Sequence, residues 1–505
     1  MTFGVPFPAG TLWDMNRVRL VDTDGRPLPC QKETTGLWAE DGAIQWVRFD
    51  ALVSQPGGCY VEVTDGADAE PTAKQPVEIA TEDDRVTVHV AGAEYLLGRG
   101  VSPIRSLSYD GRIVASADNG AWGLYVVDNR GRRGQALADG ETMVVEARGP
   151  LAASVRFEGD YATAEGHKLA RHITRLEFFA GQPAVQITHT FVLTKDTSEI
   201  WFRDIGWQLN VEPGAGAKAV FATSRTDWKK TFETDVPRGE VVYLLQDDYI
   251  QFGGGKKHFV VAGETQSESG KKETFLEGAE CGDWAALRGD AGGLMISCRD
   301  TARQHPKEFR FAAEQADFKL FSSLAGEELD FRPAALAKRW NRGGKLTGEY
   351  AESAKTLKTN AVGWCKTHEF FLRPVAPAEP EDALARLSRL HSTPVLALAD
   401  PSWIHQSRAM GPLHPKAPDR FPEAEELIYV LSGCGDQGLG KEVRRVQAGD
   451  LIHVFPGVDH YTANDGAEPL AMFVVYSPPG PEEALRELAK TLARGDGAGK
   501  GTELR

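Results

Sequence analysis

Gly449-Asp-Leu-Ile-His-Val-Phe-Pro-Gly-Val-Asp-His-Tyr-Thr-Ala-Asn464 is the stretch of this chain that decides the fold of its C-terminal part. Its first apolar residues predict a short buried strand, and Pro456-Gly457 predicts a tight turn after that strand. Beyond the turn we expect a second short strand that carries His460 on its inner face. The stretch therefore predicts part of a small β-barrel with an imidazole in its interior.

A second segment with the sequence Glu-Leu-Ile-Tyr-Val-Leu-Ser-Gly begins at Glu426. Glu426 and Gly433 keep a Glu-x6-Gly spacing, while His460 and Asn464 keep a His-x3-Asn spacing. Together the two segments resemble the paired motifs of the cupin family. That resemblance implies an antiparallel jelly-roll barrel over residues 413–480.

The cupin resemblance also implies a divalent metal ion. In that family the Glu of the first motif and the His of the second are ligands, and such a set suits Fe, Mn, Zn or Ni. The histidines of the first motif are missing here, because residues 419–422 occupy their usual places. The implied ligand set is therefore His414, Glu426 and His460. The alternative is a degenerate cupin that binds sugar or forms a dimer and holds no metal.

Composition points to a folded chain of several β-domains. With 505 residues the chain is too long for one core, so about two to four domains are expected. Its 53 Gly and 28 Pro are spread along the sequence, which favours many short strands and turns. The six cysteines form no CxxC pair, which indicates reduced thiols and a cytoplasmic location.

The charge and the hydropathy pattern exclude some partners. A net charge of −15 argues against nucleic acid and against an anionic membrane surface. No apolar run approaches the roughly 18 residues of a membrane span. The N-terminus has no basic start and no apolar h-region, so we expect no signal peptide. Carbohydrate is the partner that the motifs below favour.

Alternating apolar and polar residues divide the chain into regions. In residues 1–78 such runs, separated by turn signals, predict a small N-terminal β-barrel domain. The same alternation over residues 79–375 predicts a large β-sandwich. Pro380 and the acids after it begin a helix in a connector over residues 376–412. A second helix, Pro481–Arg494, is expected in the C-terminal helix and tail, 481–505. The expected fold is all-β: N-terminal barrel, central sandwich and C-terminal cupin barrel, with a few connecting helices.

Several short segments carry a second resemblance. Gly4–Gly10 and Asp41–Trp46 resemble the N-terminal barrel of exo-type rhamnogalacturonan lyases. Phe178–Pro183, His305–Glu308 and Lys366–Glu369 resemble the next domain of those enzymes. The resemblance covers roughly residues 1–400. Those lyases continue into an α/α toroid, whereas this chain continues into the cupin-like unit.

The lyase resemblance implies β-elimination on an acidic sugar. The reaction needs a cation to neutralise the uronate carboxylate and a base near the C5 proton. The resembling segments contain residues of these types, and we take as catalytic candidates Arg299, Lys307, Lys366 and His368. The alternative is that these cations form structural ion pairs with Asp300, Asp330 or Glu369.

Three functions remain open on the sequence. The first is a lyase-like enzyme that acts on rhamnogalacturonan-type oligosaccharides. The second is a metal-dependent cupin enzyme, an isomerase, lyase or dioxygenase, that acts on a sugar or a small acid. The third is a non-catalytic carbohydrate-binding or assembly protein in which the cupin barrel closes a homodimer.

Overall fold

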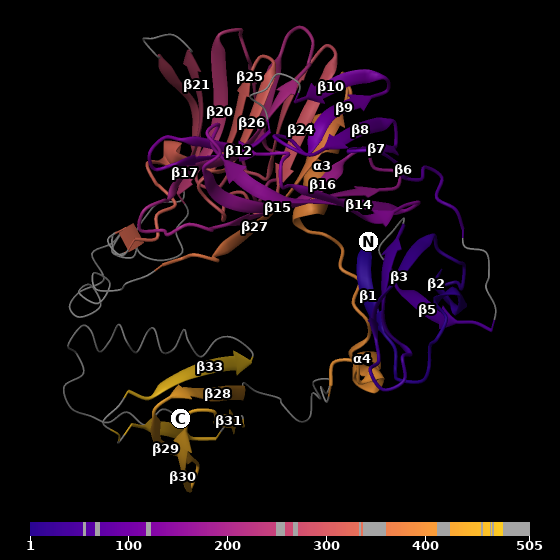
Figure 1. The fold of residues 1–505 in the computed structure, drawn as a ribbon, viewed down its shortest axis with the longest axis vertical. Coiled ribbons are helices and arrows are strands. Elements are labelled where there is room, and N and C mark those ends of the chain that lie inside the picture. The colour runs from indigo at the N-terminus through magenta and orange to yellow at the C-terminus, as the bar shows by residue number, and fades with distance from the viewer. Residues whose placement is uncertain are drawn as a thin grey trace. The chain divides into compact units, whose positions relative to one another are not determined.

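The computed structural model places most of the chain. It describes residues 1–53, 57–65, 71–117, 123–248, 258–265, 271–332, 335–336, 360–411, 425–455, 458–464, 466 and 469–477. The chain divides into two compact units, Met1–Leu398 and Ala399–Arg505 (Figure 1). The predicted helix Pro481–Arg494 and the candidate ligand His414 fall outside the described residues.

The first unit begins with a small β-domain. Its main sheet has the order β1 (Thr2–Pro6), β4 (Ile44–Ala51) and β3 (Cys30–Leu37), and β2 (Val18–Asp22) pairs with β5 (Cys59–Val63). A 3-10 turn, η1 (Met15–Arg17), precedes β2. Alternation along β4 places Val47 and Phe49 in the core with no exposed surface. The predicted hairpins of the N-terminal region are thus present.

The central domain consists of two large antiparallel sheets (Figure 1). The first sheet follows the order β6 (Glu78–Glu82), β7 (Arg85–Val90), β8 (Ala93–Gly98), β9 (Ile104–Tyr109), β10 (Arg112–Ser116), β17 (Phe202–Val211), β26 (Gln315–Phe321), β25 (Lys307–Ala312), β20 (Glu240–Asp248), β21 (His258–Thr265) and β22 (Lys272–Gly278). A short 3-10 turn, η2 (Ser323–Ala325), follows β26.

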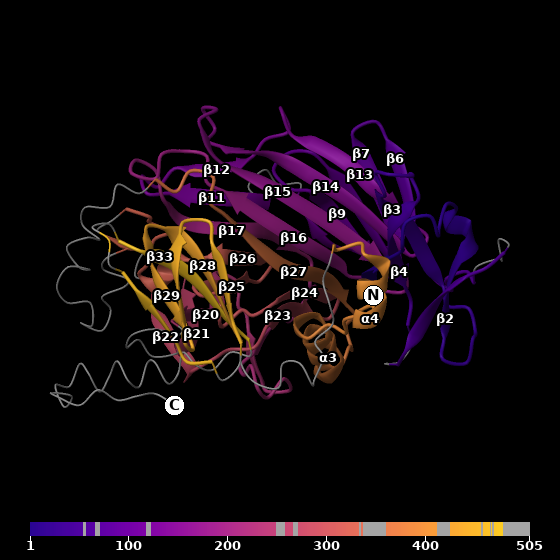
Figure 2. The ribbon, with the colours of Figure 1, turned by 90° about the horizontal axis from the view of Figure 1, so that it is seen from below.

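The second sheet contains the strands that carry most of the predicted site. Its order is β13 (Thr142–Arg148), β14 (Ala152–Ala162), β15 (Lys168–Phe179), β16 (Val185–Val192), β27 (Cys365–Val375), β24 (Gly292–Cys298), β23 (Trp284–Gly289), β18 (Lys218–Ala222) and β19 (Thr231–Asp235). Figure 2 shows β14, β15, β16 and β27 side by side. Strands β11 (Gly123–Asp128) and β12 (Arg133–Ala136) connect the two sheets, because β11 pairs with β17 and β12 pairs with β14.

Apolar side chains from both sheets fill the space between them. Phe370 of β27 contacts Trp207 and Phe318 of the other sheet, at ring-centroid distances of 5.9 and 5.4 Å. The outer face of the second sheet is covered by helix α3 (Glu381–Ser392), whose Leu384 and Ala385 are buried against it. The domain is therefore a sandwich with a third, helical layer. The expected all-β class is confirmed, and α3 and α4 (Pro401–Ser407) are the α-helices among the described residues.

The second unit contains a small β-barrel. One sheet has the order β31 (Leu451–Val454), β28 (Glu425–Ser432) and β33 (Ala471–Ser477); the other has the order β30 (Glu442–Gln447), β29 (Cys434–Leu439) and β32 (His460–Ala463). Gly433 separates β28 from β29 with a φ of 80°. A Cβ there would lie 2.5 Å from the Pro469 carbonyl oxygen, so only glycine fits this motif position.

The described helices do not include a membrane span. None of them is both long enough and apolar enough to cross a bilayer.

Candidate functional site

A basic cluster lies between the two sheets of the central domain. Lys307 begins β25 of the first sheet, and His368 belongs to β27 of the second. Alternation turns both side chains toward the interior, beside the core residues Phe309 and Phe370. Lys307 has no exposed surface, His368 is 7% exposed, and Lys307 Nζ lies 3.3 Å from His368 Nδ1. The cluster therefore links one sheet to the other.

The hydrogen bonds of Lys307 define the protonation of His368. An ammonium group has three N–H donors, and Lys307 Nζ reaches the Gln304 carbonyl oxygen at 3.1 Å, the Leu320 carbonyl oxygen at 2.8 Å and His368 Nδ1. Nδ1 must then be an acceptor, so the ring is neutral and carries its proton on Nε2. Gln304 Oε1 lies 3.2 Å from the same Nδ1 and would accept from it if Lys307 lost its proton.

Burial shifts the pKa of both groups downward. The pKa of Lys307 is lowered from 10.5 to about 8, mainly by desolvation and also by the positive charge of Lys366. Burial, Lys307 and Lys366 together hold the pKa of His368 well below its usual value. Neither lysine forms an ion pair with a described residue. A buried ammonium without a carboxylate is costly, and such perturbed groups occur mainly at functional sites.

The structure brings three of the four catalytic candidates together and separates the fourth. Lys307, His368 and Lys366 belong to the cluster, because Lys366 precedes His368 on the same face of β27. Arg299 lies on the opposite face, where its guanidinium pairs with Glu369 and donates to the His391 carbonyl oxygen of α3 at 3.0 and 3.2 Å. Arg299 thus makes the structural ion pair that was the alternative.

A row of buried polar side chains continues from the cluster along the second sheet. His189 is the cross-strand neighbour of His368, and its Nδ1 lies 2.9 Å from Thr174 Oγ1. Thr174 Oγ1 lies 3.1 Å from His172 Nδ1, and His172 Nε2 lies 3.3 Å from Glu141 Oε1. Desolvation lowers the pKa of His189 to about 3. None of the residues in this row is among the sequence-predicted site residues, although the alternation in Ile187-Thr-His-Thr-Phe191 indicates an inward His189.

Aromatic side chains stand next to the cluster at the surface. Trp364, two residues before Lys366, is 38% exposed, and its ring packs on Phe331 at a centroid distance of 4.9 Å. Arg332 lies 3.6 Å from the centroid of the Trp201 ring and is held there by Asp330. Trp364 and Lys366 therefore offer an aromatic face and a cation outside the buried pair.

The barrel of the second unit holds the other candidate residues. Glu426 shares the inner face of β28 with Ile428 and Val430, which are buried core residues. His460 begins β32, and its Nε2 lies 2.7 Å from Glu426 Oε2. His453 points to the other face of β31 from the core residues beside it. The two predicted ligands from the described residues are thus in direct contact.

Other polar groups complete the interior of this barrel. Thr462 donates to Gln437 Oε1 at 2.6 Å, and Gln437 is only 2% exposed. Asn464 Oδ1 accepts from the Gly466 N–H at 3.0 Å, as expected of a turn residue. Among the described residues no three His, Cys, Asp or Glu side chains gather at one point. A carboxylate and an imidazole fit a divalent metal, and a third protein ligand would have to come from outside those residues.

The outer face of the β31–β28–β33 sheet is apolar and exposed. Tyr429 lies at its centre and is the cross-strand neighbour of Phe473 and Leu451. The exposed fractions of the large side chains on this face lie between 39% and 66%. This surface has the character of an interaction site.

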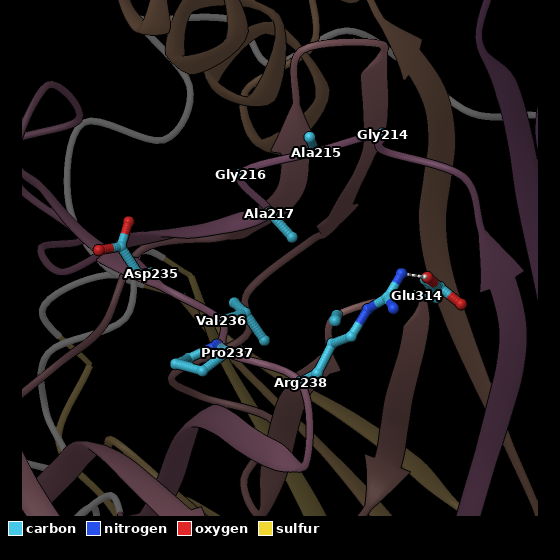
Figure 3. A pocket seen from close by; sticks show the side chains of 10 residues that line it. Gly214, Ala215, Gly216, Ala217, Asp235, Val236, Pro237, Arg238 and Glu314 are labelled. Atoms are coloured by element: carbon cyan, nitrogen blue, oxygen red, sulfur yellow. Dashed lines mark hydrogen bonds and ion pairs between the residues drawn. The ribbon is translucent and has the colours of Figure 1, made fainter.

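A separate hollow of about 420 Å³ opens at one end of the central domain (Figure 3). The turns 214–217 and 235–238 line it. Figure 3 shows Arg238 directed toward Glu314, with which it pairs at 3.2 Å. Both side chains are mostly exposed. This hollow resembles a solvated surface depression more than a reaction site.

Comparison with protein families identifies three domains in this chain. Residues 1–58 match a PcRGLX-like N-terminal RIFT barrel domain, and residues 71–218 match a PcRGLX-like central beta sandwich domain. Residues 412–476 match a cupin domain. The architecture expected from the sequence is thus confirmed: two PcRGLX-like domains followed by a cupin.

More distant similarities extend over longer stretches. "Uncharacterized protein YetA" of Bacillus subtilis (strain 168) is 19% identical in an alignment 457 residues long, which covers 81% of this chain and 52% of that protein. The chain thus spans about half the length of this curated relative.

Two solved structures align with long stretches of this chain at low similarity. One is a Glycosyl Hydrolase Family 38 protein from Enterococcus faecalis, with 9% identity, a TM-score of 0.43, and coverage of 94% of this chain and 52% of that one. The other is a galactose mutarotase related enzyme from Lactobacillus acidophilus, with 9% identity, a TM-score of 0.24, and coverage of 60% and 98%. At these scores neither similarity carries an argument.

Proposed function

We propose that the central domain binds acidic oligosaccharides of the pectin type and cleaves them by β-elimination. The observation that carries this proposal is the contact between Lys307 and His368, with Lys366 beside them and no carboxylate of a described residue paired to either lysine. A uronate would supply the missing negative charge. The resemblance to exo-type rhamnogalacturonan lyases and the matching PcRGLX-like domains support carbohydrate as the substrate class.

The cluster divides the work of an elimination among its members. Lys366, which is partly exposed, would pair with the substrate carboxylate and make the neighbouring C–H more acidic. While Lys307 is charged, the Nε2–H of His368 can donate to an oxygen of the substrate. When Lys307 loses its proton, His368 Nδ1 can donate to Gln304 Oε1, and Nε2 becomes free to accept the C5 proton. The C5–H electron pair then forms the C4–C5 double bond, the C4–O bond breaks, and the leaving oxygen takes a proton from solvent. Lys307 would thus be a positioning residue that selects the tautomer of His368.

The direct test is the appearance of unsaturated product. The full chain is incubated with rhamnogalacturonan oligosaccharides, and the ultraviolet absorbance of the new double bond is followed. The same oligosaccharides with their carboxyl groups reduced to alcohols serve as the control, because they cannot form the carboxylate contact. We expect absorbance to rise only with the acidic substrate. No rise with either substrate would reject the lyase proposal.

The contact between Glu426 and His460 favours a second candidate function. A metal-dependent cupin enzyme acting on a sugar or small acid would hold its metal through these two side chains, with His414 as the third ligand. A bound divalent ion would supply Lewis-acid chemistry there. The protein would contribute the barrel interior, in which Gln437 and Thr462 are already joined by a hydrogen bond. Metal analysis of the purified protein distinguishes this candidate from the first.

A further inference from the structure

A second cavity lies where the N-terminal domain meets the central sandwich, on the face of the second sheet opposite to the basic cluster. It has a volume of about 470 Å³, within the usual range for pockets that bind small molecules. Strands β1, β3 and β4 form one wall, and β13, β14 and β15 form the other. The side-chain amide of Gln31 joins the walls, because it bonds the Leu151 N–H at 3.3 Å, the Ala152 N–H at 3.3 Å and the Ala152 carbonyl at 3.2 Å.

Most charged groups in this cavity already have partners. Glu146 accepts from Arg175 at 2.6 and 3.1 Å and also pairs with Arg156. Asp50 accepts from Thr2 at 2.6 Å and pairs with Arg48 at 3.3 Å. These bonds fix the walls of the cavity but leave those groups little capacity for a ligand.

Two polar groups on opposite walls have no partner within the part of the chain that the structure describes. The Nε of Arg48, on β4, is buried and makes no hydrogen bond, although the Nη2 of the same side chain pairs with Glu33 at 3.0 Å. The carboxylate of Glu177, on β15, makes no hydrogen bond or ion pair with a described residue. Burial raises the pKa of Glu177, as do the carboxylates of Asp50 and Glu146, while Arg175 and Arg48 oppose the rise. Buried polar groups normally have partners, so Arg48 Nε is a donor that lacks one, while the Glu177 carboxylate is a partly exposed acceptor on the other wall.

We propose that this cavity binds a neutral saccharide of one or two rings, held between Arg48 Nε and the Glu177 carboxylate. A sugar hydroxyl both donates and accepts, so neighbouring hydroxyls can satisfy the Glu177 acceptor and the Arg48 donor together. The apolar lining of Phe179, Ala147 and Ala153 suits the C–H face of a sugar ring. The site is distinct from the basic cluster and does not depend on the proposed lyase activity.

The charges of the cavity argue against other ligands. Four carboxylates and two guanidinium groups line it, so an anionic sugar would meet a net negative wall. A simple ammonium ion could approach Glu177, but it would leave Arg48 Nε unsatisfied and would face two guanidinium groups. A neutral polyol is the class that satisfies both open positions without adding charge.

The test is calorimetric titration of the full chain with L-rhamnose, D-galactose and lactose, and with D-galacturonate as the charged comparison. At least one neutral sugar should bind with 1:1 stoichiometry, and galacturonate should bind at least about tenfold more weakly in this cavity. Glu177→Gln should weaken binding about tenfold or more, because it removes a charged acceptor. Arg48→Lys should weaken it similarly, since it keeps the charge but loses the Nε donor.

Matched variants separate this site from others. Glu62→Gln, on β5 outside the cavity, and Lys366→Gln, in the basic cluster, should both leave the affinity unchanged. Amide exchange of the unmodified protein gives a second measurement: the sugar should protect β4 and β15 selectively. The proposal is overturned if no neutral sugar binds below about 20 mM. It is also overturned if Glu177→Gln and Arg48→Lys leave binding intact, or if the protected strands lie elsewhere.

Discussion

The two histidines of the candidate sites stand in opposite surroundings. His368 in the central sandwich faces the ammonium group of Lys307, whereas His460 in the cupin barrel faces the carboxylate of Glu426. His368 is almost fully buried, while the His460 side chain is 31% exposed. Both imidazoles point inward from β-strands, His368 from the 11-residue β27 and His460 from the 4-residue β32, so being on an inward-facing strand position does not distinguish them.

The difference shows that the partner, and not the strand, assigns chemistry to an imidazole. Beside a cation a neutral ring is favoured, and such a ring suits proton transfer with an anionic substrate. Beside a carboxylate the ring belongs to a donor set that suits a metal ion. Substitutions at the two histidines and at the residues around them can test this difference between His368 and His460.

The largest effect is expected at His368. His368→Gln should lower the rate of product formation by about a hundredfold or more, because it removes the group placed to transfer a proton. His460→Gln should leave that rate unchanged. The measurement is initial rate at saturating acidic oligosaccharide. An equal loss of rate in His368→Gln and His460→Gln would mean that the central sandwich and the cupin barrel act together in one reaction. That result would contradict the separate roles assigned to the two histidines.

The pH dependence of stability should reveal the buried ammonium group. Since the folded pKa of Lys307 is about 8 and its ordinary value is 10.5, the unfolded chain binds more protons between these values. The cost of the buried charge is thus fully present below pH 8 and disappears as the pH rises toward 10.5. Between these pH values the free energy of unfolding of the unmodified protein should rise by about 3 kcal/mol relative to that of Lys307→Met.

Urea unfolding of the two proteins at pH 7 and pH 10 measures this difference. Lys168→Met, which removes an exposed lysine on β15, should show no comparable trend with pH. A stability difference between the two proteins that does not change with pH would show that burial does not lower the pKa of Lys307. The proposed control of the His368 tautomer would then fail as well.

Metal content sharpens the other side of the comparison. If His460 and Glu426 are ligands, purified protein should contain Fe, Mn, Zn or Ni, and His460→Ala should weaken metal binding by about tenfold or more. His453→Ala is a matched control, because that ring lies on the opposite face of β31. Elemental analysis of all three proteins is the measurement. Metal that stays bound in His460→Ala would reject the assigned ligand set.

The smallest effect is expected from the apolar outer face of the cupin sheet. If this face pairs two copies, sedimentation should give a mass of about twice the 55.0 kDa of the chain. Tyr429→Glu should then shift the equilibrium toward monomer. Val443→Lys, which replaces a similarly exposed residue on β30, should not. A monomer in the unmodified protein would contradict the predicted homodimer.

Local patterns predicted the fold better than the site. Strand alternation and short motifs involve residues that are close together in the sequence. The all-β class, the two family resemblances and the helix near Pro380 could therefore be recognised from the sequence. The contact between Lys307 and His368 joins two sheets through residues distant in the chain, and only the tertiary structure reveals it. Arg299 illustrates this limit of the sequence prediction. It pairs with Glu369, which follows His368 on β27, and successive side chains of a strand point to opposite faces of the sheet.

The row from His189 to Glu141 was missed for a related reason. In the sequence each of these residues looks like an ordinary polar residue of an alternating strand. Only the pairing of β14, β15 and β16 places their side chains in contact with one another. The cavity at the domain junction was also invisible in the sequence. Arg48 and Glu177 lie on separate domains, and their significance comes from one guanidinium nitrogen and one carboxylate that make no hydrogen bond to a described residue.

The exposed thiol of Cys365 gives the central domain an attachment point for a spectroscopic reporter. Cys365 is the first residue of β27, immediately before Lys366, and its side chain is on the other face of the strand. Cys30, Cys281 and Cys298 are buried, so a fluorophore-maleimide would reach Cys365 in preference to them. A dye there would sit next to the basic cluster without occupying it. Binding of an oligosaccharide could then be followed as a change in the emission of the dye. The same measurement would apply to variants that bind the oligosaccharide but no longer cleave it.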